Sequence, residues 1–392
     1  MAFQGVPQRR WPRSVAAAGM PAGRSFWLGA AATIAVVGLA VAAIARNAGP
    51  DTTVEDGAAL IRQAESLIDR DLALATYDQA IARLQSKADR DVDALKWLTQ
   101  AQAGRGRVLD VIHVSDIALF GLPSSEHSRP LGLWQGENSL FILDVGQQLL
   151  YRSDVEGDHL EVALKPGDTH ADQPLGGLVA GAWSPPQGVN TDGRLMLVDT
   201  ARSILSISPS GTRRWWPPDA DQWERIGPIA ATYENLFLLD TGRGLVWQYP
   251  ARVALARATT AATSANEPRM SQAIDMATDG NLYFLLPDGS IRKLAPGGGS
   301  LPFEGRVPGQ ALVGPVAVFA HPDLDRIWVL DPPASRVVEF TNGGAYARQY
   351  VFPRNVIIQG KSLQIDPAVE EMRVLTSDRV LSVKMRPGGT TS

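Results

Sequence analysis

A single strand–turn–strand pattern recurs six times between residues 140 and 384, and it limits the possible folds more than any other feature of the chain. In each copy a short apolar run ends at a turn, and a second β-rich run follows. The copies span Leu140–Arg152, Leu195–Ile207, Leu236–Gln248, Leu282–Leu294, Ile327–Phe340 and Met372–Lys384. Two β-rich runs around a short turn predict a β-hairpin. Because the first run does not alternate apolar with polar residues, we expect its strand to be covered on both faces.

The spacing of the copies indicates how the hairpins assemble. The residues that end the apolar runs are Asp144, Asp199, Asp240, Leu286, Asp331 and Thr376, which gives a period of about 45 residues. Most copies are preceded by a strand rich in glycine or small residues, at Gly177–Trp183, Gly227–Tyr233, Ala273–Ala277, Gly314–Ala320 and Ser362–Ile365. This period, with several strands per unit, is typical of a β-propeller blade. We therefore predict a mainly β fold, a six-bladed β-propeller whose blades pack face to face.

Two copies carry a resemblance to a known repeat family. GPVAVFAHPDLDRIWVLDPPASRVVEF (Gly314–Phe340) and AIDMATDGNLYFLLPDGSIRKL (Ala273–Leu294) resemble NHL-type repeats, and the broader TolB-like class shares their architecture. The resemblance covers roughly residues 107–385, and the copies ending at Leu286 and Thr376 depart from the Asp-ending pattern. It implies a six-bladed propeller, and it implies no particular activity because propellers host many unrelated functions.

The N-terminal region reads as a membrane anchor. Residues 1–25 contain four arginines and no acidic residue, and Phe26–Ala45 is uncharged over a length that matches the hydrocarbon core of a bilayer. Basic residues before the span and acidic residues after it predict a cytoplasmic N-terminus in the cytoplasmic membrane of a bacterium, with the rest of the chain outside. The alternative is a cleaved signal peptide, with Ala43–Ala45 as its A-x-A site. We favour a single transmembrane helix over 26–45, because this span exceeds the usual apolar region of a signal peptide.

Residues 46–104 form a helical region. Leu74, Tyr77, Ile81, Leu84 and Ala88 lie three and four residues apart, which predicts an amphipathic helix within a group of two or three. One interpretation is a short α-helical spacer between membrane and propeller. The other is a coiled-coil or partner-binding surface. We favour the spacer.

The propeller is expected over 105–387, with a disordered tail over 388–392. The sixth repeat ends at Lys384 and lacks an outer strand. We predict that Arg107–Val114 supplies this strand and closes the ring, because closure removes an exposed sheet edge.

The sequence indicates no catalytic residues, no metal site and no cofactor. The chain has no cysteine, which excludes disulfides and thiolate chemistry, and its net charge of −4 does not favour a nucleic-acid partner. No nucleophile-elbow, zincin, Walker A or dinucleotide motif is present. The repeated Asp144, Asp199, Asp240 and Asp331 are interpreted as turn carboxylates that accept backbone N–H groups.

Five residues are candidates for binding. Arg202 and Arg243 follow equivalent strands of adjacent repeats, so they would either grip a carboxylate or phosphate or remain solvated turn residues. Trp215, Trp216 and Trp223 lie within nine residues and would form an aromatic platform for a protein or glycan; the alternative is that Trp215 or Trp216 packs between blades as part of an outer strand. Both interpretations of each group stay open at this point.

Two classes of function remain. The first is a membrane-anchored, extracytoplasmic propeller that acts as a non-enzymatic binding or scaffold module for a protein or saccharide partner. The second is a six-bladed-propeller hydrolase, lactonase or lyase, which in relatives is often metal-dependent and would need polar side chains that converge near the axis. We favour binding over catalysis, because the predicted inner strands are apolar and small.

Overall fold

The computed structural model describes residues 52–123, 125–136, 138–187, 192–253 and 256–385. The predicted span at Phe26–Ala45 and the predicted tail at 388–392 lie outside these residues. No helix in the described part of the chain is both long and apolar enough to cross a membrane.

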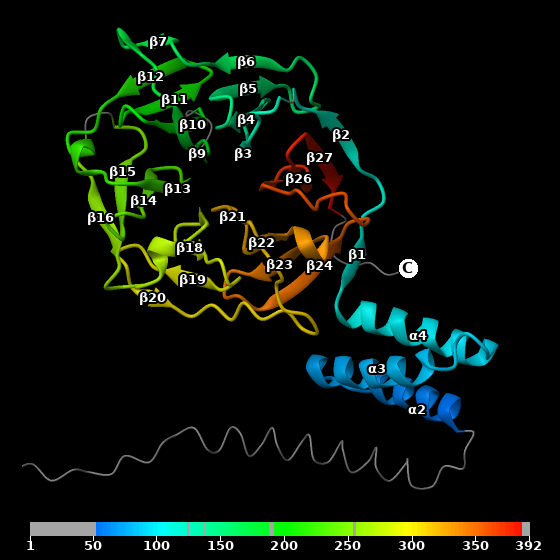
Figure 1. Ribbon diagram of the computed structural model, residues 1–392. Helices are drawn as coiled ribbons and strands as arrows, with labels where there is room; N and C mark the ends of the chain where they lie inside the picture. The colour runs from blue at the N-terminus through cyan, green and yellow to red at the C-terminus, as the bar shows by residue number, and fades with distance from the viewer. Residues whose placement is uncertain (1–51, 124, 137, 188–191, 254–255, 386–392) are drawn as a thin grey trace, which may run out of the picture.

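Six β-sheets are arranged around a central axis, which confirms the predicted six-bladed propeller (Figure 1). The first three blades are β3 (Pro130–Gln135), β4 (Leu140–Asp144), β5 (Leu149–Ser153) and β6 (Glu161–Leu164); β9 (Leu178–Ser184), β10 (Arg194–Asp199), β11 (Ile204–Ser208) and β12 (Gly211–Trp215); and β13 (Ile226–Ala231), β14 (Asn235–Asp240), β15 (Leu245–Pro250) and β16 (Thr259–Thr263). The strands pair in sequence order, so the first strand of each blade is innermost.

The other three blades repeat this order. They are β17 (Asp275–Thr278), β18 (Leu282–Leu285), β19 (Ile291–Leu294) and β20 (Ser300–Leu301); β21 (Ala317–Ala320), β22 (Arg326–Asp331), β23 (Arg336–Thr341) and β24 (Tyr346–Val351); and β25 (Ser362–Asp366), β26 (Glu371–Leu375), β27 (Arg379–Lys384) and β2 (Ala118–Gly121). The remaining elements are the small hairpin of β7 (Thr169–His170) and β8 (Gln173–Pro174), and the 3₁₀ turns η1 (Ala220–Gln222), η2 (Met270–Gln272) and η3 (Pro332–Ala334).

The second strand of each blade is apolar on both faces because it packs against two neighbouring blades. In β14, Leu236 and Leu238 join a core cluster with blade 2, whereas Phe237 and Leu239 join the cluster with blade 4. Alternate side chains of a strand point to opposite faces of the sheet, so a non-alternating run fills two interfaces at once. One such cluster lies at each of the six blade interfaces.

Buried carboxylates fix the hairpin end of the blades. Asp240, which is 0% exposed, accepts N–H groups from Glu224 and Arg225, which lead into the inner strand, and from Gly242 and Arg243 in the hairpin turn, at 2.9–3.2 Å. We call this arrangement the carboxylate clamp. The residues at the same position of blades 1, 2 and 5, Asp144, Asp199 and Asp331, also accept backbone N–H groups and are at most 2% exposed. The predicted turn role is confirmed.

The ring closes differently from the prediction. β2 pairs antiparallel with β27, with Ala118 opposite Ser382. The prediction that Arg107–Val114 closes the ring is wrong. This segment begins in a helix, and its strand β1 (Val111–His113) pairs parallel with β24 as a fifth strand of blade 5. The helix ends beside blade 5, so the chain covers that open edge first and reaches blade 6 only afterwards.

Three helices precede the ring and pack on one another: α2 (Thr53–Glu65), α3 (Arg70–Gln85) and α4 (Val92–Val108). The predicted stripe is largely buried, with Tyr77 and Leu84 in the core. Tyr77 lies against Gly104, where an added Cβ would come within 2.5 Å of its ring. α4 continues to Val108, four residues past the expected boundary at 104.

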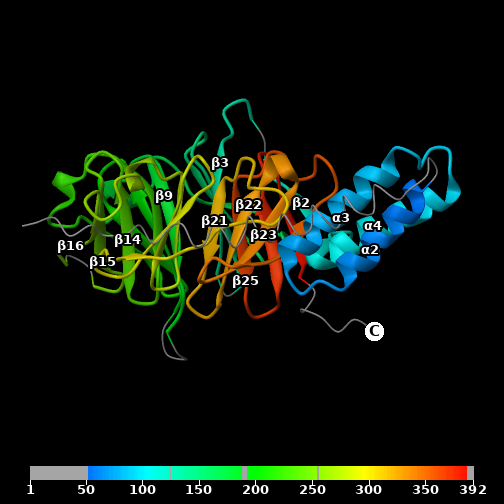
Figure 2. The ribbon, with the colours of Figure 1, turned by 90° about the horizontal axis from the view of Figure 1, so that it is seen from below.

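The helices lie beside blade 5 rather than above or below the ring (Figure 2). Arg70 donates to the Tyr346 carbonyl at 3.2 Å, and the Tyr346 hydroxyl donates to the Leu109 carbonyl. Arg306 pairs with Asp71 at 3.0 Å. The helices therefore contact the propeller directly, and their role as a spacer from the membrane stays a prediction.

The clamp carboxylates are expected to contribute strongly to stability. Replacing Asp240 by Asn puts an NH₂ group among donors, so Asp240→Asn should lower the free energy of unfolding by about 2–4 kcal/mol. Urea denaturation followed by circular dichroism measures this change. Asp221→Asn, at an exposed carboxyl on η1, is the matched control and should change it by less than about 0.5 kcal/mol. Equal effects of the two variants would contradict the clamp.

Candidate functional site

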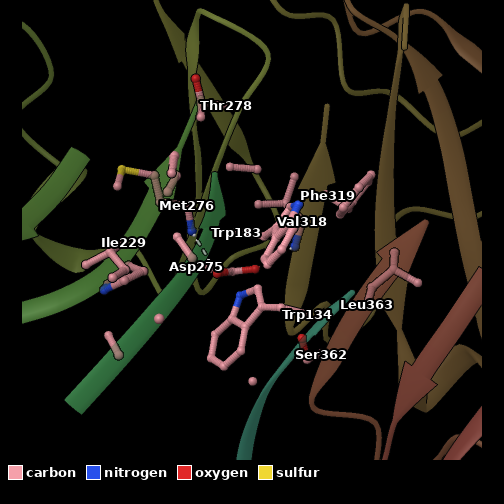
Figure 3. A pocket seen from close by; sticks show the side chains of 18 of the residues that line it. Trp134, Trp183, Ile229, Asp275, Met276, Thr278, Val318, Phe319, Ser362 and Leu363 are labelled. Carbon is pink, nitrogen blue, oxygen red and sulfur yellow. Dashed lines mark hydrogen bonds between the residues drawn. The ribbon is translucent and has the colours of Figure 1, made fainter. Parts of the chain in front are cut away.

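The inner strands of all six blades surround a cavity on the propeller axis. It has a volume of about 380 Å³, and its lining includes residues of β3, β9, β13, β17, β21 and β25 (Figure 3). Each inner strand pairs with the rest of its blade along one edge only. Its other edge presents backbone groups to the axis, so polar groups are available even where side chains are apolar.

Small and apolar side chains make up most of the wall, and two tryptophans occupy the space that glycines leave. The ring of Trp134 lies against Gly181 of the next blade, where an added Cβ would be 2.6 Å from the ring. Trp183 lies against Gly136, where an added Cβ would be 2.9 Å from its ring, and it stacks on Phe141 with 6.3 Å between ring centroids. The position of each indole therefore depends on a glycine.

One carboxylate lies in this wall. Asp275, at the start of β17, is half-buried, and its Oδ1 accepts the N–H of Met276 at 2.9 Å. Its Oδ2 accepts the N–H of Val318 on the inner strand of blade 5 at 2.8 Å. Burial raises the pKa of the Asp275 carboxyl to about 7, and the two backbone hydrogen bonds limit the increase. No cationic side chain among the described residues forms an ion pair with Asp275.

The other polar residues of the cavity lie at both of its ends, and those at the start of β25 are the exposed Lys361 and the half-buried Ser362. Thr278 lies at the far end of β17, and His321 follows the far end of β21. Burial lowers the pKa of His321, and its Nδ1 accepts the N–H of Asp323 at 3.2 Å. In the described part of the chain, no group of three His, Cys, Asp or Glu side chains could hold a metal ion.

Exposed aliphatic side chains lie at one end of the propeller, and two of them, Leu131 and Ile274, line the cavity. Leu131, Ile274, Val313 and Ile358 are between 43% and 58% exposed. Each lies where the chain enters an inner strand, which is the end that carries the carboxylate clamps. We call this set the apolar rim. It comes from blades 1, 4, 5 and 6, so it lies around the axis rather than on a single blade.

The predicted tryptophan platform does not form as one exposed surface. Trp223 is 3% exposed and donates from Nε1 to the Tyr249 hydroxyl at 3.0 Å, within the interface of blades 2 and 3. Trp215 packs against the same cluster. Trp216 is half-buried under the guanidinium of Arg214, 4.7 Å from the ring centroid. A role of these tryptophans in binding stays a prediction.

The two predicted arginines lie near each other but donate to the protein backbone. Arg202 donates to the Asp221 carbonyl at 2.6 Å, and Arg243 donates to the Gln222 carbonyl at 3.0 Å. Both therefore hold η1, whose carbonyls would otherwise lack partners. Both side chains are exposed, and a role of these two residues in binding stays a prediction.

Sequence reasoning missed Asp275 and Trp134. Asp275 lies within the predicted inner strand Ala273–Ala277, where it is the one charged residue. A charge inside a strand next to the axis was the available signal. Trp134 lies in β3, and no inner strand was predicted for the first repeat.

No family model and no curated protein matches the chain. Solved structures do match. Virginiamycin B lyase from Staphylococcus aureus has 12% sequence identity and a TM-score of 0.44, over 69% of this chain and 99% of that one. A chain of the nidogen/laminin complex has 13% identity and a TM-score of 0.41, over 57% and 81%. The RRP9 WD40 repeats have 11% identity and a TM-score of 0.40, over 68% and 97%. At these values no function is inferred from the likeness, and the NHL-type or TolB-like assignment stays a prediction.

The Asp275 carboxyl is expected to make stability depend on pH between about 4 and 7. Its pKa is raised in the folded state, so the folded protein keeps a proton that the unfolded chain releases. The resulting stabilisation is complete below the unfolded pKa and is lost as the pH rises through about 7.

Asp275→Asn stays neutral at every pH, so its stability should not show this loss. Between pH 4 and pH 8, the difference in free energy of unfolding between variant and wild type should shift in favour of the variant by roughly 1–3 kcal/mol. Urea titrations of both proteins at the two pH values measure this. A difference that does not change with pH would contradict the raised pKa.

Proposed function

We propose that this protein is a membrane-anchored, extracytoplasmic propeller that acts as a non-enzymatic binding module for a protein partner. The observation that carries the proposal is the apolar rim. Four exposed aliphatic side chains from four blades lie where the chain enters the inner strands, and two of them, Leu131 and Ile274, line the axial cavity. Exposed apolar groups that gather on one face mark interaction sites, whereas scattered ones do not.

The chemistry of the rim favours a protein over a saccharide. Leu131, Ile274, Val313 and Ile358 are aliphatic, so they offer contact area without hydrogen-bond donors or acceptors. The exposed Arg202 and Arg243 lie on hairpin connections at the same end and would provide a polar margin. An apolar centre with a polar margin is the usual arrangement of a protein–protein interface.

A second candidate function, a propeller hydrolase, lactonase or lyase, rests on Asp275. A carboxyl with a pKa of about 7 is suited to general-base catalysis. Such a reaction would also need a group to stabilise developing charge. Thr278 and His321 lie at the other end of the cavity, and Lys361, just before β25, is exposed, so we favour binding.

Substitutions in the rim should remove the partner. Val313→Asp combined with Ile358→Asp places two charges in the proposed contact and should reduce capture of a membrane-extract protein by at least about tenfold. Pull-downs with the full-length, detergent-solubilised chain, quantified by mass spectrometry, measure this.

The matched control is Val162→Asp combined with Val253→Asp. These valines are 48% and 57% exposed but lie on the outer strand of blade 1 and after β15, away from the rim. The control should capture the same protein as the wild type. If both double variants retain the partner, or both lose it, the rim is not the binding surface.

The membrane anchor is tested separately. The mature protein from a membrane fraction is expected to retain residues 1–45, because the span is longer than a signal-peptide core. N-terminal sequencing identifies the first residue, and protease treatment of spheroplasts should digest the propeller. A mature N-terminus at Arg46 would show cleavage and would contradict the anchor.

A further inference from the structure

We propose that the axial cavity is a binding site for an amphipathic cation, in which an ammonium or guanidinium group binds Asp275 and its apolar stem packs against the tryptophan-lined wall. This inference deepens the proposed binding function and rests on it only for the identity of the natural ligand. Nothing in the rim is needed for a small cation to occupy the cavity.

The first argument is unused hydrogen-bonding capacity. A carboxylate has about four acceptor positions on its two oxygens. Asp275 uses one on each oxygen, for Met276 and Val318. Both donors are backbone N–H groups of inner strands, so they hold the carboxylate in place from the wall side. The remaining acceptor positions are available to a donor in the cavity (Figure 3).

The second argument is charge. Asp275 has no cationic partner among the described residues, although removing a carboxylate from water disfavours its ionised form. A bound cation would supply the missing opposite charge and stabilise that form. An anion would be repelled, and a neutral ligand would gain only an ordinary hydrogen bond.

The third argument is shape. A volume of about 380 Å³ lies within the range of small-ligand pockets. Trp134 and Asp275 both project into this space from opposite blades (Figure 3). An indole face attracts a cation and also packs against apolar groups. The wall thus offers one carboxylate and a large aromatic surface, which together match a cation on an apolar stem; Lys361, just before β25, is the cationic residue of the lining, and it is exposed and forms no ion pair with Asp275 among the described residues.

Two sources of this chemistry exist: a free amine, or a lysine or arginine side chain of the partner that docks on the rim. In both cases the charged group must reach Asp275, so one binding experiment tests them together. The probes are 2-phenylethylamine, the isosteric 2-phenylethanol, and 3-phenylpropionate. The full-length chain in lipid nanodiscs is titrated by isothermal calorimetry at pH 8.

The expected result is selectivity by charge. 2-Phenylethylamine should bind about tenfold or more tightly than 2-phenylethanol, because its hydrogen bond to the carboxylate is charge-assisted. 3-Phenylpropionate should not bind. Asp275→Asn should reduce the affinity for the amine to that for the alcohol, while Asp221→Asn should leave both unchanged. Thermal unfolding confirms that each variant is folded.

The pH dependence provides an independent measurement. Below the pKa of Asp275 the ligand must displace a proton, so the affinity for the amine should fall by up to about tenfold per pH unit below pH 7, whereas the affinity for the alcohol should not change. Calorimetry at pH 6 in two buffers of different ionisation enthalpy should detect proton release on binding of the amine.

The source of the cation is identified with two peptides, Ac-Leu-Lys-Leu-NH₂ and Ac-Leu-Gln-Leu-NH₂. Stronger binding of the lysine peptide than of 2-phenylethylamine supports a partner side chain, and binding of the amine alone supports a free amine. Equal binding of amine and alcohol, or unchanged amine binding in Asp275→Asn, overturns the proposal. Failure of the rim variants to alter amine binding leaves the cavity site intact, so the two proposals fail independently.

Discussion

The carboxylate clamp is the interaction on which the geometry of this propeller depends. In four blades, a buried aspartate at the end of the second strand accepts backbone N–H groups from the chain that enters the inner strand, and in blades 1, 2 and 3 also from the hairpin connection. Buried N–H groups without partners are costly, so one carboxylate stabilises two loops at once. The clamps also fix where the inner strands begin, and those starting points form the end of the cavity that carries the apolar rim.

The two blades without this aspartate differ in an informative way. Leu286 takes the position in blade 4 and Thr376 in blade 6, where the threonine hydroxyl donates to Asp378 and accepts the N–H of Arg379. Blade 4 has no clamp carboxylate, and it is the blade whose inner strand carries Asp275. That carboxylate binds two N–H groups at the axis, one of them from blade 5. Blade 4 therefore has no clamp carboxylate at its hairpin but carries a half-buried aspartate in the wall of the cavity.

The repeated pattern was sufficient to predict the fold, because in each copy the apolar run has to be buried on both faces of its strand. Leu236 and Phe237 must be covered on opposite faces, and only neighbouring blades can do this. Ring closure was harder to predict, because it depends on which blade lies beside the end of α4. The position of the helices follows from tertiary contacts such as that of Arg70 with Tyr346, which the sequence pattern does not show. The cavity residues were missed for a related reason. Asp275 is one charge in an apolar strand, and its meaning depends on five other strands that converge on it.

The pairing of β2 with β27 has a consequence for how the protein is made. Ala118 lies opposite Ser382, so β2 cannot form its hydrogen bonds with β27 until the end of the chain has been synthesised. Contacts this distant in sequence slow folding, and domains emerge from the ribosome N-terminus first. Blades 1 to 5 can form their own hairpins during synthesis, but the sixth sheet is completed last. Until then β2 and β27 each have an unpaired edge, and such an edge can pair with another chain.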